Sequence, residues 1–70
     1  MKWEEGESGN YWYCKTPVGK YEITILDRVY ADLGSIRIYS GDYVEEAKGE
    51  AKIHLLKTYY SLKIYLEINE

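Results

Sequence analysis

The C-terminal third of the chain, from Asp42 onward, has the composition of one long helix. It contains no proline and a single glycine, Gly49, among many Leu, Lys and Glu residues, which are good helix formers. Asp42 stands where an N-cap is expected, and Glu45, three residues later, completes a capping-box pattern. We therefore predict a helix over residues 42–68, with fraying after Leu66.

Two apolar stripes run along opposite sides of this predicted helix, given the turn of about 100° per residue. The first is small near the helix start, at Ala47 and Ala51, so that a sheet can approach it closely; we assign this stripe to the core. The second points nearly the opposite way, where a single sheet cannot cover it. The first stripe comprises Val44, Ala47, Ala51, Leu55, Thr58, Leu62 and Leu66, flanked by Tyr59 and Tyr65, and the second comprises Ile53, Leu56, Tyr60 and Ile64.

We call the second group the back stripe. One interpretation is that the N-terminal arm covers it, or that its residues stand exposed singly, as apolar residues often do. The other is that it binds a second copy of the chain or a partner protein. We favour the second interpretation and take Ile53, Leu56, Tyr60 and Ile64 as the candidate protein-binding or dimer interface.

A β-hairpin is the clearest feature before the helix. Residues 11–15 and 20–26 have strand-like composition and flank the turn sequence Thr16-Pro17-Val18-Gly19. Pro17 fixes its own φ, and Gly19 is free to adopt a positive φ. We therefore predict a type I turn with a bulge between two antiparallel strands.

Alternation along the strands assigns their faces, because successive side chains point to opposite sides of a sheet. Residues 35–39 form a third predicted strand, in which Ile36 and Ile38 point inward. Residues 27–34 are predicted as a looser connection, with a strand extension near Val29. The remaining inward residues are Trp12, Cys14, Tyr21, Ile23 and Ile25.

These elements predict an α+β fold in which three or four antiparallel strands form a meander and one long C-terminal helix packs on one sheet face. Residues 1–70 form one domain, because a chain of this size supplies one core. Within it, residues 1–10 form an arm or edge strand, 11–40 the sheet, and 42–68 the helix. The other sheet face stays open, and its outward side chains make a second candidate binding face: Tyr11, Tyr13, Arg37 and Tyr39.

Composition limits the classes of function. The single cysteine, Cys14, excludes an intramolecular disulfide and a cysteine metal site. A net charge of −3 argues against nonspecific nucleic-acid binding. No apolar run approaches membrane length and the first ten residues do not resemble a secretion signal, so we expect a cytoplasmic protein with no membrane partner. Nine Tyr, two Trp and no Phe suit protein interfaces.

A series of residues carries a resemblance: Trp3, Trp12, Cys14, Thr16-Pro17-Val18-Gly19, Tyr21 and Ile23, then Gly41, Glu45-Glu46-Ala47-Lys48 and Ala51. Together they resemble a group of short phage and prophage proteins of uncharacterised function. Those proteins carry a Trp-x-Ala-x-Thr-Pro-Val-Gly-x-Tyr-x-Ile hairpin and a Glu-Glu-Ala-Lys helix start. The helix after Ala51 departs from the family's more polar tail. The resemblance implies a phage-related origin, and hence the cytoplasm of a bacterial host.

Few residues are candidates for catalysis. The one histidine, His54, is predicted to be solvated or to cap at the helix edge. Cys14 is predicted to point inward, where a buried thiol is inert. Asp27, Asp32 and Asp42 lack the spacing of a calcium loop. We therefore expect no enzymatic activity, no cofactor and no metal site.

The function we favour is a protein-binding inhibitor of a host defence enzyme, similar in kind to the anti-CRISPR proteins of phages. Its partner would be a host protein or a protein–nucleic-acid complex. Acidic residues near the helix start could mimic nucleic-acid phosphate if they cluster with Glu4, Glu5 and Glu7. This acidic candidate site comprises Asp42, Glu45, Glu46 and Glu50.

Two other functions remain open. One is a DNA-binding module that resembles the small sheet-reading domains of integrases and plant-type transcription factors. Its four cations are scattered among acidic residues, so direct nucleic-acid binding is not what we expect. The other is a self-associating protein with no client, and we expect a homodimer in either case. The DNA contacts would be Lys15, Lys20, Arg28 and Arg37.

Overall fold

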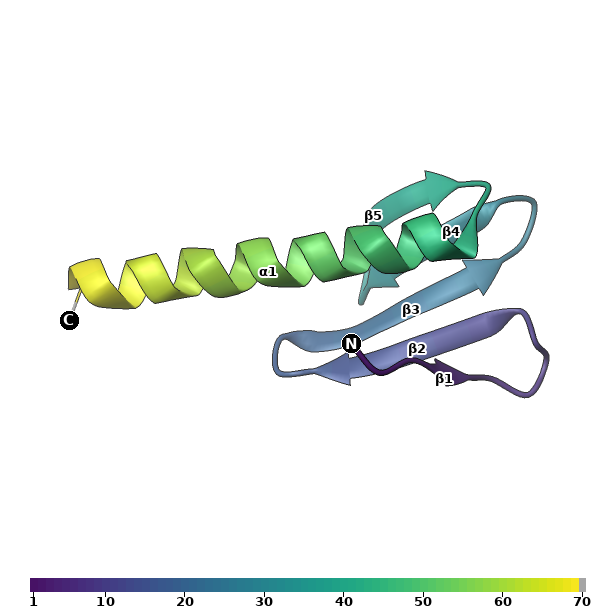
Figure 1. The fold of residues 1–70 in the computed structure, drawn as a ribbon, viewed down its shortest axis with the longest axis horizontal. Helices are drawn as coiled ribbons and strands as arrows, with labels where there is room; N and C mark the ends of the chain where they lie inside the picture. The colour runs from purple at the N-terminus through teal and green to yellow at the C-terminus, as the bar shows by residue number, and fades with distance from the viewer. Residues whose placement is uncertain (70) are drawn as a thin grey trace.

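The computed structural model describes residues 1–69, which form a five-stranded antiparallel sheet and one helix (Figure 1). The strands lie side by side in chain order, and the helix packs on one face of the sheet. The predicted α+β class is confirmed, but the predicted three or four strands are too few. The elements are β1 (Glu4–Glu5), β2 (Tyr11–Thr16), β3 (Gly19–Ile25), β4 (Val29–Leu33), β5 (Ile36–Gly41) and α1 (Val44–Asn69).

The predicted hairpin joins β2 and β3. Thr16 pairs directly with Gly19, so the loop has two residues and the bulge predicted beside it is wrong. The Thr16 hydroxyl donates to the Gly19 carbonyl oxygen at 2.7 Å and accepts from the Val18 N–H at 3.3 Å. Gly19 has a φ of 137°, a value that favours glycine over residues with a side chain.

Two strands account for the larger number of strands. Glu4 of β1 pairs with Tyr13 of β2, which confirms the edge-strand alternative for residues 1–10. In β4, Val29 and Ala31 are buried, whereas Tyr30 and Asp32, which alternate with them, point to the other face. Ala31 and Asp32 are weak strand formers, which is why their sequence predicts a connection over residues 27–34 instead of a strand.

The predicted outward position of Tyr39 is wrong because β5 contains an irregularity. The pairing of β4 with β5 slips by one residue after Ala31, which leaves Ile38 as an extra residue in β5. Tyr39 therefore turns to the helix side, where it packs against the core and its hydroxyl donates to Glu46 Oε1 at 2.9 Å. Beyond the slip, Ile36 was predicted to point inward but is 59% exposed.

Tyr39 also explains the glycine at the end of β5. Gly41 is buried and pairs with Val29. A Cβ atom at this position would overlap the hydroxyl and ring of Tyr39. Gly41 thus makes room for Tyr39 at the last position of β5.

The core lies between the sheet and the first half of α1. Ala47 and Ala51 are fully buried, and their small side chains bring the helix close to β3, β4 and β5. Tyr21 and Ile23 are the largest fully buried side chains. The inward residues predicted for the hairpin are therefore confirmed: Cys14, Tyr21 and Ile23 are buried, and Trp12 and Ile25 pack against the core together with Trp3, Ile38, Tyr39 and Val44.

The helix begins slightly later than predicted. The Tyr43 carbonyl accepts the first helical bond, from the Ala47 N–H at 3.2 Å, so Tyr43 is the N-cap residue and the prediction of Asp42 is off by one. The carboxylate of Asp42 lies instead 3.6 Å from Nε of Arg28. This ion pair links the β3–β4 connection to the residues before the helix.

The helix is much longer than the sheet beneath it. Its 26 residues span about 39 Å, whereas the seven residues of β3 span about 23 Å. Figure 1 shows the C-terminal half of α1 extending past the strands. Leu62 and Leu66, predicted to lie in the core, are therefore exposed, and the last residue of the predicted core stripe that is even partly buried is Thr58.

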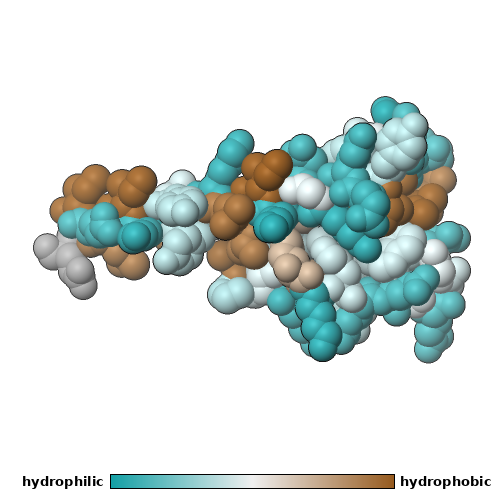
Figure 2. Space-filling model, viewed as in Figure 1, coloured by the Kyte–Doolittle hydropathy of each residue, from teal (hydrophilic) through white to brown (hydrophobic). Residues whose placement is uncertain are grey.

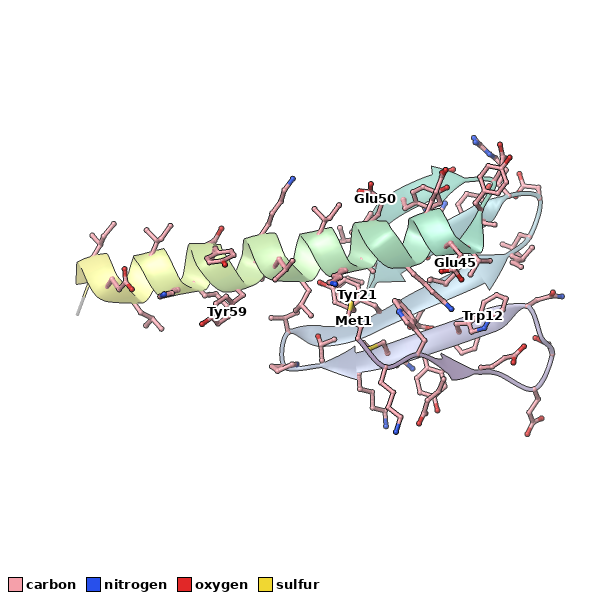
Figure 3. The ribbon with its side chains drawn as sticks, viewed as in Figure 1. Met1, Trp12, Tyr21, Glu45, Glu50 and Tyr59 are labelled. Atoms are coloured by element: carbon pink, nitrogen blue, oxygen red, sulfur yellow. The ribbon has the colours of Figure 1, made fainter. Side chains whose placement is uncertain are left out.

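One hydrogen bond joins the sheet to the middle of the helix. Tyr21 of β3 is fully buried, and its hydroxyl lies 2.7 Å from Nδ1 of His54 (Figure 3). Burial raises the pKa of Tyr21, so its hydroxyl stays protonated and is held in this hydrogen bond with the His54 ring. The predicted solvated or capping role of His54 is therefore wrong. Its ring satisfies the one polar atom that Tyr21 carries into the core.

We predict that Tyr21→Phe lowers the free energy of unfolding by about 1 kcal/mol, because it removes this hydrogen bond and leaves His54 Nδ1 without its partner. Tyr30→Phe is the matched control: it removes a hydroxyl that donates to Asp27 Oδ1 in an exposed position, and should change stability by less than about 0.5 kcal/mol. Urea denaturation of both variants measures the difference. Equal losses of unfolding free energy in the two variants would contradict the claim that the Tyr21–His54 hydrogen bond stabilises the fold more than an exposed hydrogen bond does.

Candidate functional site

The back stripe lies on the side of α1 that faces away from the sheet. Its four side chains, Ile53, Leu56, Tyr60 and Ile64, are between 45% and 57% exposed. Ala47 and Ala51, which contact the sheet, lie on the opposite side of the helix. The structure therefore brings the predicted interface residues together on one accessible face.

A second apolar surface, which the sequence placed in the core, lies where α1 passes the end of the sheet. We call Tyr59, Leu62 and Leu66 the distal stripe; each is more than half exposed. The distal stripe continues the sheet-facing side of the helix, and the rings of Tyr59 and Tyr60 meet edge to face at 5.5 Å, which connects it to the back stripe. Figure 2 shows apolar residues along this half of the helix.

The chain exposes more surface than a compact protein of its mass. Its accessible surface is 5155 Å², whereas a folded monomer of 8.2 kDa is expected to expose about 4,500 Å². The excess, about 600 Å², approaches the roughly 800 Å² that each partner buries in a typical interface. The extended half of α1 is the part of the fold that produces this excess (Figure 1).

The acidic candidate residues do not form one cluster with the acidic arm. Glu4 and Glu5 belong to β1, at the edge of the sheet opposite to β5 and the helix start. Three of the four helix-start residues also have neighbours that offset or engage their charge: Asp42 has Arg28 at 3.6 Å, Glu45 has Lys48 at 3.7 Å, and Glu46 accepts from Tyr39 at 2.9 Å. A nucleic-acid backbone presents a regular row of phosphate charges, and these partly neutralised carboxylates do not form such a row.

The open sheet face carries two tyrosines of β2 beside Glu22 of β3. The rings of Tyr11 and Tyr13 stack with centroids 5.9 Å apart. The Tyr11 hydroxyl donates to Glu22 Oε2 at 2.6 Å, and this bond, with burial and the negative charge of Glu22, raises the pKa of Tyr11 to about 12. The nearby carboxylate of Glu4 raises the pKa of Tyr13. Tyr11 and Tyr13 therefore form part of this face as predicted.

The other half of the open face centres on Arg37. Its guanidinium lies 4.1 Å from the ring centre of Tyr30 and its Nε lies 3.0 Å from Oδ1 of Asp32. Tyr30, which sequence reasoning did not include, thus takes the place predicted for Tyr39. The missing signal was the strand β4, whose alternation puts Tyr30 and Asp32 on this face.

The cations predicted to contact DNA are largely neutralised within the chain. Arg28 lies 3.6 Å from Asp42, Arg37 lies 3.0 Å from Asp32, and Lys20 lies 4.0 Å from Glu22. DNA binding depends on concentrated positive charge that is free to meet phosphate. The open sheet face lacks that concentration.

Other chemistry is sparse over residues 1–69. Cys14 is buried, and no group of three His, Cys, Asp or Glu side chains in this part of the chain is placed to hold a metal ion. Lys2, Glu4, Tyr13 and Lys15 line a shallow hollow beside the sheet edge. No helix among the described residues has the length and apolar character needed to cross a membrane.

Comparisons of the chain with protein-family models, with curated proteins and with solved structures find no match. The resemblance of the hairpin and helix start to short phage proteins therefore stays a prediction. The candidate surfaces must be judged by their geometry and chemistry alone.

We predict that Glu22→Gln lowers the pKa of Tyr11 from about 12 toward its ordinary value of 10.0, because the hydrogen bond that the Tyr11 hydroxyl donates to the negative carboxylate stabilises the protonated form. In the folded protein this raised pKa contributes stability that is present below pH 10 and is lost as the pH rises through about 12. NMR titration of the Tyr11 ring carbon bonded to oxygen measures the shift. Glu67→Gln, on the extended half of α1, removes the same charge and should leave Tyr11 unchanged.

Proposed function

We propose that this chain is a small protein-binding protein that acts by covering part of the surface of a larger host protein. The observation that carries the proposal is the extended half of α1, which has apolar side chains on both the back stripe and the distal stripe. A helix that is apolar on more than one side is normally buried. Here the sheet ends before it can cover the distal stripe, and the back stripe faces away from the sheet.

The distal stripe suits a client protein. Tyr59, Leu62 and Leu66 follow the spacing of four, three and four residues with Leu55, the pattern of a helix that lies in an apolar groove. Tyr59 adds a large aromatic surface with a polar tip, a residue type enriched where binding energy concentrates. The expected partner surface is therefore a groove lined by apolar side chains.

The host protein that we propose is a defence enzyme, so that the chain acts as an inhibitor in the manner of anti-CRISPR proteins. The proposal draws on the resemblance of the hairpin and helix start to short phage proteins, and on the small size and net charge of −3. A negative protein is attracted to enzymes that bind nucleic acids, because their working surfaces are basic. We further propose a cytoplasmic location and a non-enzymatic mode of action.

A plaque assay tests this function. Bacteria that carry one defined CRISPR–Cas or other nuclease-based defence system are infected with a phage that the system targets, with and without expression of the chain. Across a panel of such systems, we expect the chain to restore plaque formation against at least one. The double variant Leu62→Asp/Leu66→Asp should abolish this protection, because it places two charges in the apolar contact.

Leu26→Asp is the matched control, since Leu26 is an exposed leucine that lies outside the helix. Its protection should equal that of the unaltered chain. The proposal is wrong if the chain protects against none of the panel, or if the double variant, shown to be folded by circular dichroism, protects as well as the control.

A further inference from the structure

The back face of α1 has the spacing of a seam between two helices. From Gly49, apolar or small residues follow at steps of four, three and four, through Ile53 and Leu56 to Tyr60. This is the heptad spacing by which helices pack along their length. All four positions are exposed and lie opposite the sheet. A second helix could therefore approach this face without meeting the chain's own sheet.

Gly49 is unexplained within the single chain. Glycine in a helix interior is destabilising relative to alanine, so a structural reason is expected for it. Among residues 1–69, a Cβ atom at Gly49 would meet no atom within 4 Å beyond its own helical turn, so no contact there requires a glycine. The close approach of a second helix, with a bulky side chain against Gly49, would supply the reason.

Charged residues flank this seam in two rows. Glu50 and Lys57 lie along one edge, and Glu45 and Lys63 along the other, as follows from the turn of about 100° per residue. Figure 3 shows Glu45 and Glu50 on opposite edges of α1. Glu45 also lies 3.7 Å from Lys48, yet its side chain remains 88% exposed. In each row a glutamate near the helix start is followed by a lysine farther along.

These rows favour one orientation of a second copy. A two-fold axis that relates two antiparallel helices runs perpendicular to both of them. It therefore places each row of charged residues beside the same row of the second copy. Glu50 then faces Lys57 of the second copy, and Glu45 faces Lys63 of the second copy. Each attraction occurs twice by symmetry, whereas the Lys52 side chains of the two copies meet once, near the axis. The same register places Gly49 against Tyr60 and Ile53 against Leu56. The charged pairs and the apolar pairs thus agree on one alignment.

A parallel pairing has the opposite charge pattern. In that arrangement each row of charged residues lies beside the other row of the second copy. Glu50 then approaches Glu45 of the second copy, and Lys57 approaches its Lys52 and Lys63. Like charges would then repel on both sides of the seam. Electrostatic complementarity therefore selects the antiparallel arrangement.

We propose that two copies of this chain associate antiparallel through Gly49, Ile53, Leu56 and Tyr60, giving four layers in the order sheet, helix, helix, sheet. Each patch is self-complementary, as a two-fold interface requires. Leu62 and Leu66 of each copy point away from this seam, toward the side of its own sheet, while Tyr59 lies at the edge of the seam against Tyr60. The dimer therefore does not depend on the proposed function, and it leaves the distal stripe accessible to a client.

Charge reversal tests the register in the purified full chain. Positions 50 and 57 are two helical turns apart, too far for their side chains to pair within one helix, so coupling between them reports a contact between copies. Each of Glu50→Lys and Lys57→Glu should weaken dimerisation about tenfold, because every reversal acts twice in a symmetric pair. The double variant should restore it. Sedimentation equilibrium over a range of concentrations gives the dissociation constants.

Both residues are exposed, so the variants should keep the fold, which circular dichroism checks. Leu56→Asp places a charge in the seam and should give a folded monomer. Leu26→Asp, outside the helix, should leave the dimer intact. Three outcomes would overturn the proposal. The chain could be a monomer at every concentration, even if it associates with a different protein, or the single charge reversals could strengthen association, as a parallel pair requires. The third is a double variant whose dimer dissociates as readily as those of the single variants.

Discussion

The dominant constraint on this protein is the mismatch in length between its helix and its sheet. Ala47 and Ala51 allow α1 to lie close to the sheet at one end, and the core of the fold lies there. The strands end after five to seven residues in β2 to β5, but the helix continues for 26. Apolar residues that would extend the core therefore have no strand beneath them, and the distal stripe is exposed for this reason.

Much of the fold could be predicted because local patterns and tertiary packing agree. In the hairpin, Cys14, Tyr21 and Ile23 alternate with polar residues, and their burial follows the alternation. The prediction failed where one residue changes the period: the extra Ile38 in β5 moves Tyr39 from the open face to the helix side. Alternation cannot reveal such an insertion, because the slip depends on how β5 pairs with β4.

The candidate sites likewise include features that local spacing predicts and features that depend on tertiary packing. The back stripe was readable from helical spacing alone, and the structure leaves it exposed. Leu62 and Leu66 continued the core stripe by the same spacing, and only the sheet's extent shows that they lie outside the core. Strand lengths compared with helix length gave a usable signal for this. The Tyr21–His54 bond had none, because it joins positions that are distant in the chain and meet only in the packed fold.

The most direct test of the account is amide hydrogen exchange along α1 as a function of protein concentration. The first half of the helix packs on its own sheet and should be protected at every concentration. If a second copy covers the back face, amides of residues 53–65 should become more protected as concentration rises, since protection reports the opening of local structure. Fast exchange of these residues at all concentrations would contradict the claim that another chain covers this part of the helix.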